Sequence, residues 1–147
     1  MAQGSFSAQI SDWVKETRER RDAVYRGSAQ RIVEIMQTPR GAGGNLRVDT
    51  GFLRASLVVT TSSALPAQTA KPDGPVTFSY DAAASSLVIA GADIKDPITA
   101  VYTANYARPR EYGARGQAGD RWVALASQRW PQVVEQECAE ARARAGG

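Results

Sequence analysis

The sequence predicts an α+β fold: a twisted, mostly antiparallel sheet of about four strands, flanked by two long helices and one short helical turn. Three observations support this. Apolar residues recur at helical spacing over 7–36, β-branched segments gather within 48–113, and a second helical stripe follows over 120–143. The chain has 147 residues and a mass of 15.7 kDa, enough for one modest core, so we expect a single domain over 1–147.

The first helix is predicted over 7–36, with Ser7 or Ser11 as its cap and Pro39 ending it. A helix of about 28 residues is roughly 42 Å long. That exceeds what a globule of 15.7 kDa needs, so we expect part of its apolar stripe to meet another subunit. The stripe comprises Ile10, Trp13, Val14, Thr17, Arg21, Val24, Ala29, Ile32 and Ile35.

The predicted sheet region follows a Gly-rich loop at 38–45. Asp49 is expected to cap a short helical turn over 51–56. Residues 62–75 are rich in Pro, Gly, Ser and Ala, which indicates an exposed, mobile insert. Asp81-Ala-Ala-Ala is interpreted as the turn of a hairpin. The strands are predicted at 57–61, 76–80, 86–90 and 98–104.

The C-terminal part begins with the segment 105–113, which leads into a second loop at 114–120 that we expect to be mobile. The last helix is predicted over 120–143, with Asp120 as its N-cap. Pro131 lies inside it and has no amide hydrogen, so we expect a kink or a brief break there.

The composition excludes several kinds of chemistry. The chain has no histidine, which removes the usual general base near neutral pH and the commonest metal ligand. A single cysteine, Cys138, excludes an internal disulfide and a thiolate metal cage. No apolar stretch is long enough for a signal peptide or a membrane span, and we predict no cofactor, no metal and no membrane partner.

Asp49-Thr50-Gly51 has the three letters that carry the catalytic carboxylate in aspartic proteases. A protease built on one such tripeptide needs a symmetric dimer, so that two aspartates share a proton. The catalytic loop should also follow a hydrophobic strand, but here it follows the Gly-rich loop. We therefore interpret the tripeptide as a cap and turn, in which Asp49 or Thr50 binds free amides and Gly51 allows tight backbone passage.

Three other features resemble parts of catalytic or ligand-binding sites. The Gly-rich residues 41–44 lack the following Lys-Ser/Thr and the preceding strand of a phosphate loop. Glu111 lies among arginines without a partner acid or base, which favours a salt bridge or an interface charge. Cys138 follows Trp130 on the last helix and is interpreted as a buried small apolar residue. None of them predicts an enzyme.

Arginine is unusually frequent, since only three of the 18 basic residues are lysine. Arg108, Arg110 and Arg115 lie around a Tyr-containing loop. Basic residues interleaved with aromatic residues can bind along a nucleic-acid backbone. Acidic residues offset the arginines of the first helix, and no recognised nucleic-acid motif is present. Arginines lining a channel for passing DNA remain an open alternative.

Three elements occur in order: the long first helix, "VDTGFLRASL", and "NYARPREYG" followed by a Gly-rich loop and an aromatic-starting helix. This arrangement resembles the neck and tail-completion (head–tail joining) proteins of long-tailed bacteriophages, over roughly residues 5 to 142. The long insert and Pro131 depart from the family pattern. The matching residues are Val48, Asp49, Thr50, Gly51, Leu53, Arg54, Ser56, Leu57, Tyr106, Ala107, Glu111, Tyr112 and Gly113.

The resemblance implies a structural virion protein that forms a ring, commonly sixfold, between the head connector and the tail. Its partners would be copies of itself, head-completion or adaptor proteins, and a tail terminator or tail tube protein. It would be located in the virion neck, and in the host cytoplasm during assembly. The motif residues expected at interfaces are Leu53, Arg54, Tyr106, Glu111, Tyr112 and Gly113.

Two alternatives stay open. Within the same class, the chain could be a tail terminator that caps the tail tube. From another class, it could be a basic DNA-binding module. The arginines expected to contact DNA in a channel are Arg108, Arg110 and Arg115.

Overall fold

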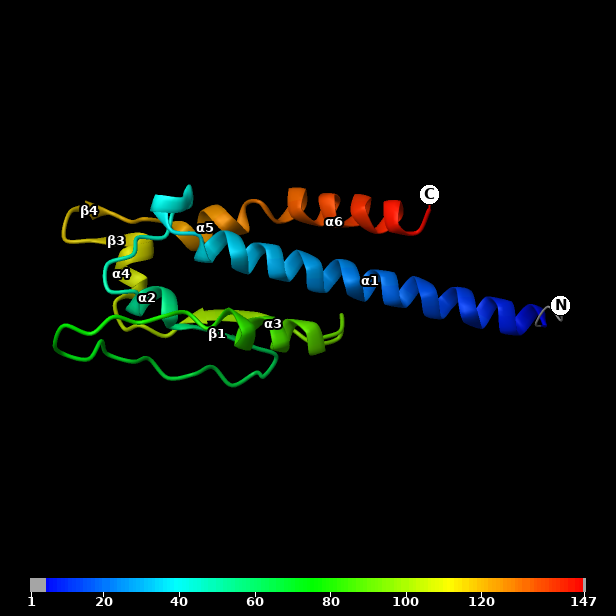
Figure 1. The fold of residues 1–147 in the computed structure, drawn as a ribbon, viewed down its shortest axis with the longest axis horizontal. Helices are drawn as coiled ribbons and strands as arrows, with labels where there is room; N and C mark the ends of the chain where they lie inside the picture. Colours follow the sequence, from blue (N-terminus) through cyan, green and yellow to red (C-terminus); the bar gives the residue numbers. More distant parts are fainter. Residues whose placement is uncertain (1–4, 147) are drawn as a thin grey trace.

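A computed structural model describes residues 5–146; the first four residues and Gly147 of the predicted domain lie outside this range. The architecture mixes helix and sheet, as predicted, and is organised along one long helix, α1 (Figure 1). Helices α5 and α6 lie along one side of α1, and α3 with the β1–β2 sheet lies along the other (Figure 1). The elements are α1 (Phe6–Gln37), η1 (Arg40–Ala42), α2 (Phe52–Ala55), β1 (Leu57–Thr60), α3 (Ala82–Gly91), β2 (Thr99–Tyr102), α4 (Ala107–Tyr112), β3 (Gly113–Ala114), β4 (Gln117–Ala118), α5 (Trp122–Ser127) and α6 (Trp130–Arg144).

Helix α1 confirms the predicted first helix and extends it by one residue at each end. It has 32 residues, which gives a length of about 48 Å at 1.5 Å per residue. The cap is Ser5, rather than either of the predicted serines, and its hydroxyl accepts a hydrogen bond from the Ala8 amide at 3.2 Å. The helix ends at Gln37, and the next residue, Thr38, has extended backbone because Pro39 follows it.

The predicted sheet of about four strands is wrong in its pairing. Within residues 5–146, β1 pairs antiparallel with β2 alone, with Leu57 opposite Tyr102, and β3 pairs with β4 in a separate two-stranded sheet. The predicted strand at 76–80 is irregular backbone. The predicted strand at 86–90 lies inside helix α3. The strands predicted at the positions of β1 and β2 are confirmed.

Helix α3 starts where a hairpin turn was predicted. The Asp81 carboxylate accepts a hydrogen bond from the Ala84 amide at 3.3 Å, so it caps the helix. The three alanines that follow are strong helix formers. Ser85 and Ile89 are the buried residues of α3, which packs against β1 and α1. A capped alanine run therefore sets helical structure in the apolar residues that follow.

The predicted last helix is broken, as expected from Pro131. Helix α5 ends at Ser127, and α6 begins at Trp130, so Pro131 lies in the first turn of α6. Proline is tolerated there because amides of the first turn have no partner within the helix. The predicted N-cap is wrong: Arg121, with φ +53°, occupies that position, and neither it nor Asp120 caps α5 through its side chain.

The two predicted loops have more structure than expected. The insert 62–75 is largely exposed and lacks regular elements, but Thr69 is held by backbone hydrogen bonds to Thr103 and Asn105. The segment 114–120 contains the β3–β4 hairpin. Its two-residue turn, Arg115-Gly116, has positive φ at both positions, as in a type I′ turn.

The core lies where α1, α5, α3 and the β1–β2 sheet meet. Trp122 is 2% exposed, and its ring packs edge-on against Tyr102 at 5.3 Å between centroids. Helices α1 and α6 are joined by Arg31, whose guanidinium binds Glu137 and, at 2.8 Å, Glu140. The buried apolar residues that form the core cluster are Ala29, Val33, Met36, Leu46, Leu53, Leu57, Val59, Ile89, Ala104, Trp122 and Ala126.

Candidate functional site

The two motif segments, far apart in sequence, meet at one surface cleft of about 260 Å³, here called the motif cleft. Residues 47–54 line one side of it, and Tyr106, Arg110 and Lys71 complete the lining. The Phe52 ring packs against the Tyr106 ring at 6.1 Å between centroids, which joins α2 to the start of α4. The structure therefore places most of the predicted site residues around one cleft.

The Asp49-Thr50-Gly51 tripeptide forms a tight turn into α2. The Thr50 hydroxyl accepts a hydrogen bond from the Phe52 amide at 3.3 Å, so Thr50 binds the first amide of α2 from outside the cap position. Asp49 is exposed, and the cap position belongs to Gly51. Gly51 has φ +87°, and a Cβ atom there would lie 2.3 Å from the Phe78 carbonyl oxygen. Only glycine fits this turn without strain.

Glu111 has a role that sequence reasoning missed. Its side chain is buried at 6% exposure. One carboxylate oxygen accepts a hydrogen bond from the Val123 amide at 3.0 Å, and the other accepts one from the Ala124 amide at 2.9 Å. Glu111 thus caps α5 from α4, and its negative charge suits the positive end of that helix. The predicted salt bridge or interface charge is wrong at this position.

Gly113 and Leu53 are also used inside the subunit. Gly113 has φ +94°, and a Cβ atom there would lie 2.5 Å from the Gln117 carbonyl oxygen, so it permits the β3–β4 hairpin to close. Leu53 belongs to the core at 5% exposure. Leu53 and Glu111 are thus buried within the subunit, where their side chains stabilise its fold.

Arg54 ties α2 to the end of α1. Its Nε donates to the Gln37 backbone carbonyl oxygen at 2.8 Å, and the side-chain amide of Gln37 donates to the Arg54 backbone carbonyl oxygen at 2.8 Å. The Arg54 guanidinium also lies over the Tyr80 ring, 5.5 Å from its centroid. By contrast, Tyr112 is 75% exposed with Arg108 over its ring at 5.7 Å, so this pair is available to a partner.

A second cleft, of about 480 Å³, adjoins the motif cleft between α4 and the β3–β4 hairpin. Arg47, Tyr106 and Arg110 line both clefts, so the two are continuous. Arg115 lines the second cleft, and Arg108 lines neither. The structure therefore brings two of the three predicted DNA-contacting arginines together.

The charge of the joined clefts is positive. Arg47, Arg54, Lys71, Arg110 and Arg115 contribute five positive charges, against two carboxylates, Asp49 and Asp120. That leaves a net charge of +3, which suits a polyanion such as a nucleic-acid backbone.

Asp120 is already neutralised within the chain. Its side chain is 5% exposed, and one carboxylate oxygen accepts hydrogen bonds from Arg40 and Arg47, each at 3.0 Å. This pairing holds the loop after α1 against the hairpin region. Sequence reasoning missed it because the residues are far apart in the chain.

Tyr106 lies at the junction of the two clefts. Burial raises the pKa of its phenol, while Arg110 and the Leu53 backbone act in the opposite direction. The phenol is therefore protonated at neutral pH and can donate a hydrogen bond to an acceptor oxygen.

The joined clefts contain two carboxylates, Asp49 and Asp120. In the part of the chain that the structure describes, Asp49 is the one carboxylate lining the motif cleft. Over residues 5–146, no group of three or more His, Cys, Asp or Glu side chains could hold a metal ion. In the same range, no helix is both long and apolar enough to span a membrane.

Two of the cleft residues had no earlier signal as site residues. Arg47 stands directly before the first motif, and Lys71 comes from the insert. The proximity of Arg47 to "VDTG" could have indicated it, whereas Lys71 depends on how the insert folds back. Comparisons of the chain with known protein families, curated proteins and solved structures found no match.

Proposed function

We propose that the chain is a structural subunit of a tailed-phage or prophage virion: a ring-forming neck or tail-completion protein that joins the head connector to the tail. The observation that carries this proposal is the convergence of the two motif segments at one cleft. Within the subunit, the motif residues serve as a cap, a core residue and two required glycines, as expected of a scaffold. The proposal includes no catalytic role.

The ring is supported by the exposed apolar end of α1. Phe6 and Trp13 are 77% and 66% exposed, and a large exposed apolar surface marks an interaction site. We infer a ring of six copies from the resemblance. Its outer partners would be a head-completion or adaptor protein on one side and a tail terminator or tail tube protein on the other. Tyr112 with Arg108 is a surface that such a partner can contact.

The joined basic clefts support a role at a DNA channel. Their net positive charge would attract phosphates without reading sequence. The same observation favours the second candidate function, a basic DNA-binding module outside a virion. A tail terminator is the remaining candidate within the virion class, and the position of the ring in the particle separates it from a neck protein.

The test is a gene deletion in the phage or prophage that encodes the chain. We expect DNA-filled heads and separate tails, because the joint is missing, and infectious particles when the gene is supplied in trans. Mass spectrometry of purified wild-type virions should find the chain. Normal, infectious virions from the deletion would refute the structural role, and a chain absent from particles that binds DNA in the cell would favour the module.

A further inference from the structure

The N-terminal end of α1 projects beyond the rest of the molecule (Figure 1). We call residues 6–15 the overhang. Phe6, Ile10 and Trp13 are 77%, 46% and 66% exposed, and they follow one another at intervals of four and three residues. These intervals place them on one face of the helix. The overhang is thus a continuous apolar face that residues 5–146 leave uncovered.

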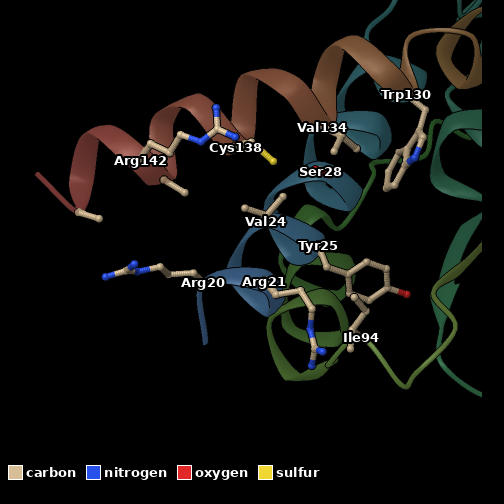
Figure 2. A pocket seen from close by; sticks show the side chains of 12 residues that line it. Arg20, Arg21, Val24, Tyr25, Ser28, Ile94, Trp130, Val134, Cys138 and Arg142 are labelled. Carbon is tan, nitrogen blue, oxygen red and sulfur yellow. The ribbon is translucent and has the colours of Figure 1, made fainter. Parts of the chain in front are cut away.

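An apolar groove of about 430 Å³ lies farther along the same molecule, between α1 and α6. Figure 2 shows that Val24, Val134 and Cys138 point into the space between the two helices, with Trp130 at one end. Arg20, Arg21 and Arg142 line the end of the groove that lies toward the overhang. The remaining apolar side chains of its wall are Tyr25, Ile94, Ala141 and Ala145.

The overhang and the groove are on the same face of α1. Stepping from Ile10 by seven residues gives Thr17 and then Val24, and seven residues are close to two helical turns. Ile10 and Val24 are therefore separated along the helix by about 21 Å but point in nearly the same direction. A single partner that packs against this face of α1 can therefore contact both the overhang and the groove.

We propose that the free chain forms a reciprocal pair, in which the overhang of each copy lies in the α1–α6 groove of the other. The two α1 helices run antiparallel, with a two-fold axis near Thr17. In this register Ile10 of one copy faces Val24 of the other, and Trp13 faces Arg21. The contact is isologous, because the same face serves both copies.

Charge and area both suit a second copy. The guanidinium of Arg21 meets the Trp13 ring, a favourable cation–π arrangement, and no like charges oppose each other at that position. Two aromatic side chains of about 150–250 Å² each lie on every overhang. With the groove surface and both halves of the pair counted, the buried area is on the order of 1,200 Å², within the range of specific interfaces.

The pair goes beyond the proposed ring and does not depend on it. A ring with only a rotation axis has no two-fold contacts, so a reciprocal pair must separate before its copies enter such a ring. A head-to-tail contact would leave one overhang and one groove of each pair free, whereas a single two-fold contact fills both at once. The shared face of α1 favours the reciprocal pair.

The first test measures the mass of the free chain in solution by light scattering and sedimentation equilibrium. We expect a particle of twice 15.7 kDa. Trp13→Ala should raise the dissociation constant of the pair at least 100-fold, since each pair loses two aromatic anchors. Lys15→Ala, on the opposite face of the overhang, is the matched control and should leave the constant unchanged. Lys15→Ala should keep the wild-type melting temperature. Trp13→Ala should lose only the stabilisation that pairing gives, so it should melt like the wild type at concentrations at which the wild type is monomeric, because neither residue contacts the core.

The second test uses Cys138, the one native cysteine, which lines the groove. Ile10→Cys should form a disulfide with Cys138 of the other copy under mild oxidation, and Lys15→Cys should not. On a non-reducing gel the cross-linked product should stop at the dimer, because the two contacts close on each other. A monomeric wild type, or no cross-link from Ile10→Cys, would overturn the proposal. A ladder of higher products would overturn the reciprocal arrangement and indicate a head-to-tail chain of contacts. All of these readouts use the free chain, so they are independent of the virion test.

Discussion

Replacing Glu111 by alanine removes both acceptors from the start of α5. In the wild type, the carboxylate binds the Val123 and Ala124 amides at 3.0 and 2.9 Å, and the side chain is 6% exposed. Helix α5 places Trp122 and Ala126 in the core, where they are 2% and 0% exposed. The substitution therefore loosens the junction on which the core packing of α5 depends.

The expected cost follows from those two contacts. Hydrogen bonds to a charged group contribute about 1.5–3 kcal/mol each, and loss of an N-terminal cap costs about 1 kcal/mol. Because the two losses share one helix end, we expect Glu111→Ala to lower the free energy of unfolding by about 3–4 kcal/mol. Glu111→Gln keeps one acceptor oxygen and loses the charge, so its cost should be about half of that.

The assay is urea unfolding followed by circular dichroism, with thermal melting as a second measure. For a chain of this size a loss of 3 kcal/mol corresponds to a fall in Tm of roughly 10 °C. Glu135→Ala is the matched control: an exposed glutamate of α6, whose loss should change stability by less than about 0.5 kcal/mol. If Glu111→Ala were no more destabilising than Glu135→Ala, the capping role would be refuted.

Three further predictions follow from other parts of the molecule. In the same unfolding assay, Gly51→Ala should cost about 2–4 kcal/mol, because a positive φ combines with a close approach to the Phe78 oxygen. Gly43→Ala is the control: Gly43 also has a positive φ but lies in open space, so the cost should be only about 1 kcal/mol. Arg110→Ala should weaken binding to duplex DNA for all sequences and reduce the slope of log affinity against log salt by about 1, measured by fluorescence anisotropy; an unchanged slope would exclude the joined clefts as a phosphate contact. Burial raises the pKa of Tyr102 above its ordinary value of 10.0, so the folded chain keeps a proton that the unfolded chain loses as the pH rises. The contribution of Tyr102 to the free energy of unfolding is complete below pH 10 and falls by about 1.4 kcal/mol per pH unit above it. Unfolding curves between pH 9 and 11 should show this fall in the wild type and a smaller one in Tyr102→Phe.

The long helix and the first motif could be predicted because their signals are local. The apolar stripe of α1 repeats over many turns, so its period is unambiguous. Helix α3 was misjudged because Leu87 to Ala90 is a short apolar run that fits either a strand or a helix. The deciding signal was the cap at Asp81 followed by alanines, which a strand does not require.

The candidate site was predicted in its parts but not in its contacts. The two motifs were selected by their likeness to a family, which does not predict that they meet in space. Residues 49–54 and Tyr106 line one cleft, whereas Glu111, Tyr112 and Gly113 lie outside it. The role of Glu111 could not be predicted, because it caps a helix on a different element and local capping rules do not cover that case. The α1–α6 groove likewise depends on the antiparallel packing of two helices from opposite ends of the chain.

The most direct test of the proposed function is a cryo-EM map of the assembled phage particle. The proposal predicts a ring of six copies between the head connector and the tail tube, with the joined basic clefts facing the DNA channel and the Arg108–Tyr112 surface against a neighbouring protein. A map that accounts for the whole neck without this chain would contradict the proposal.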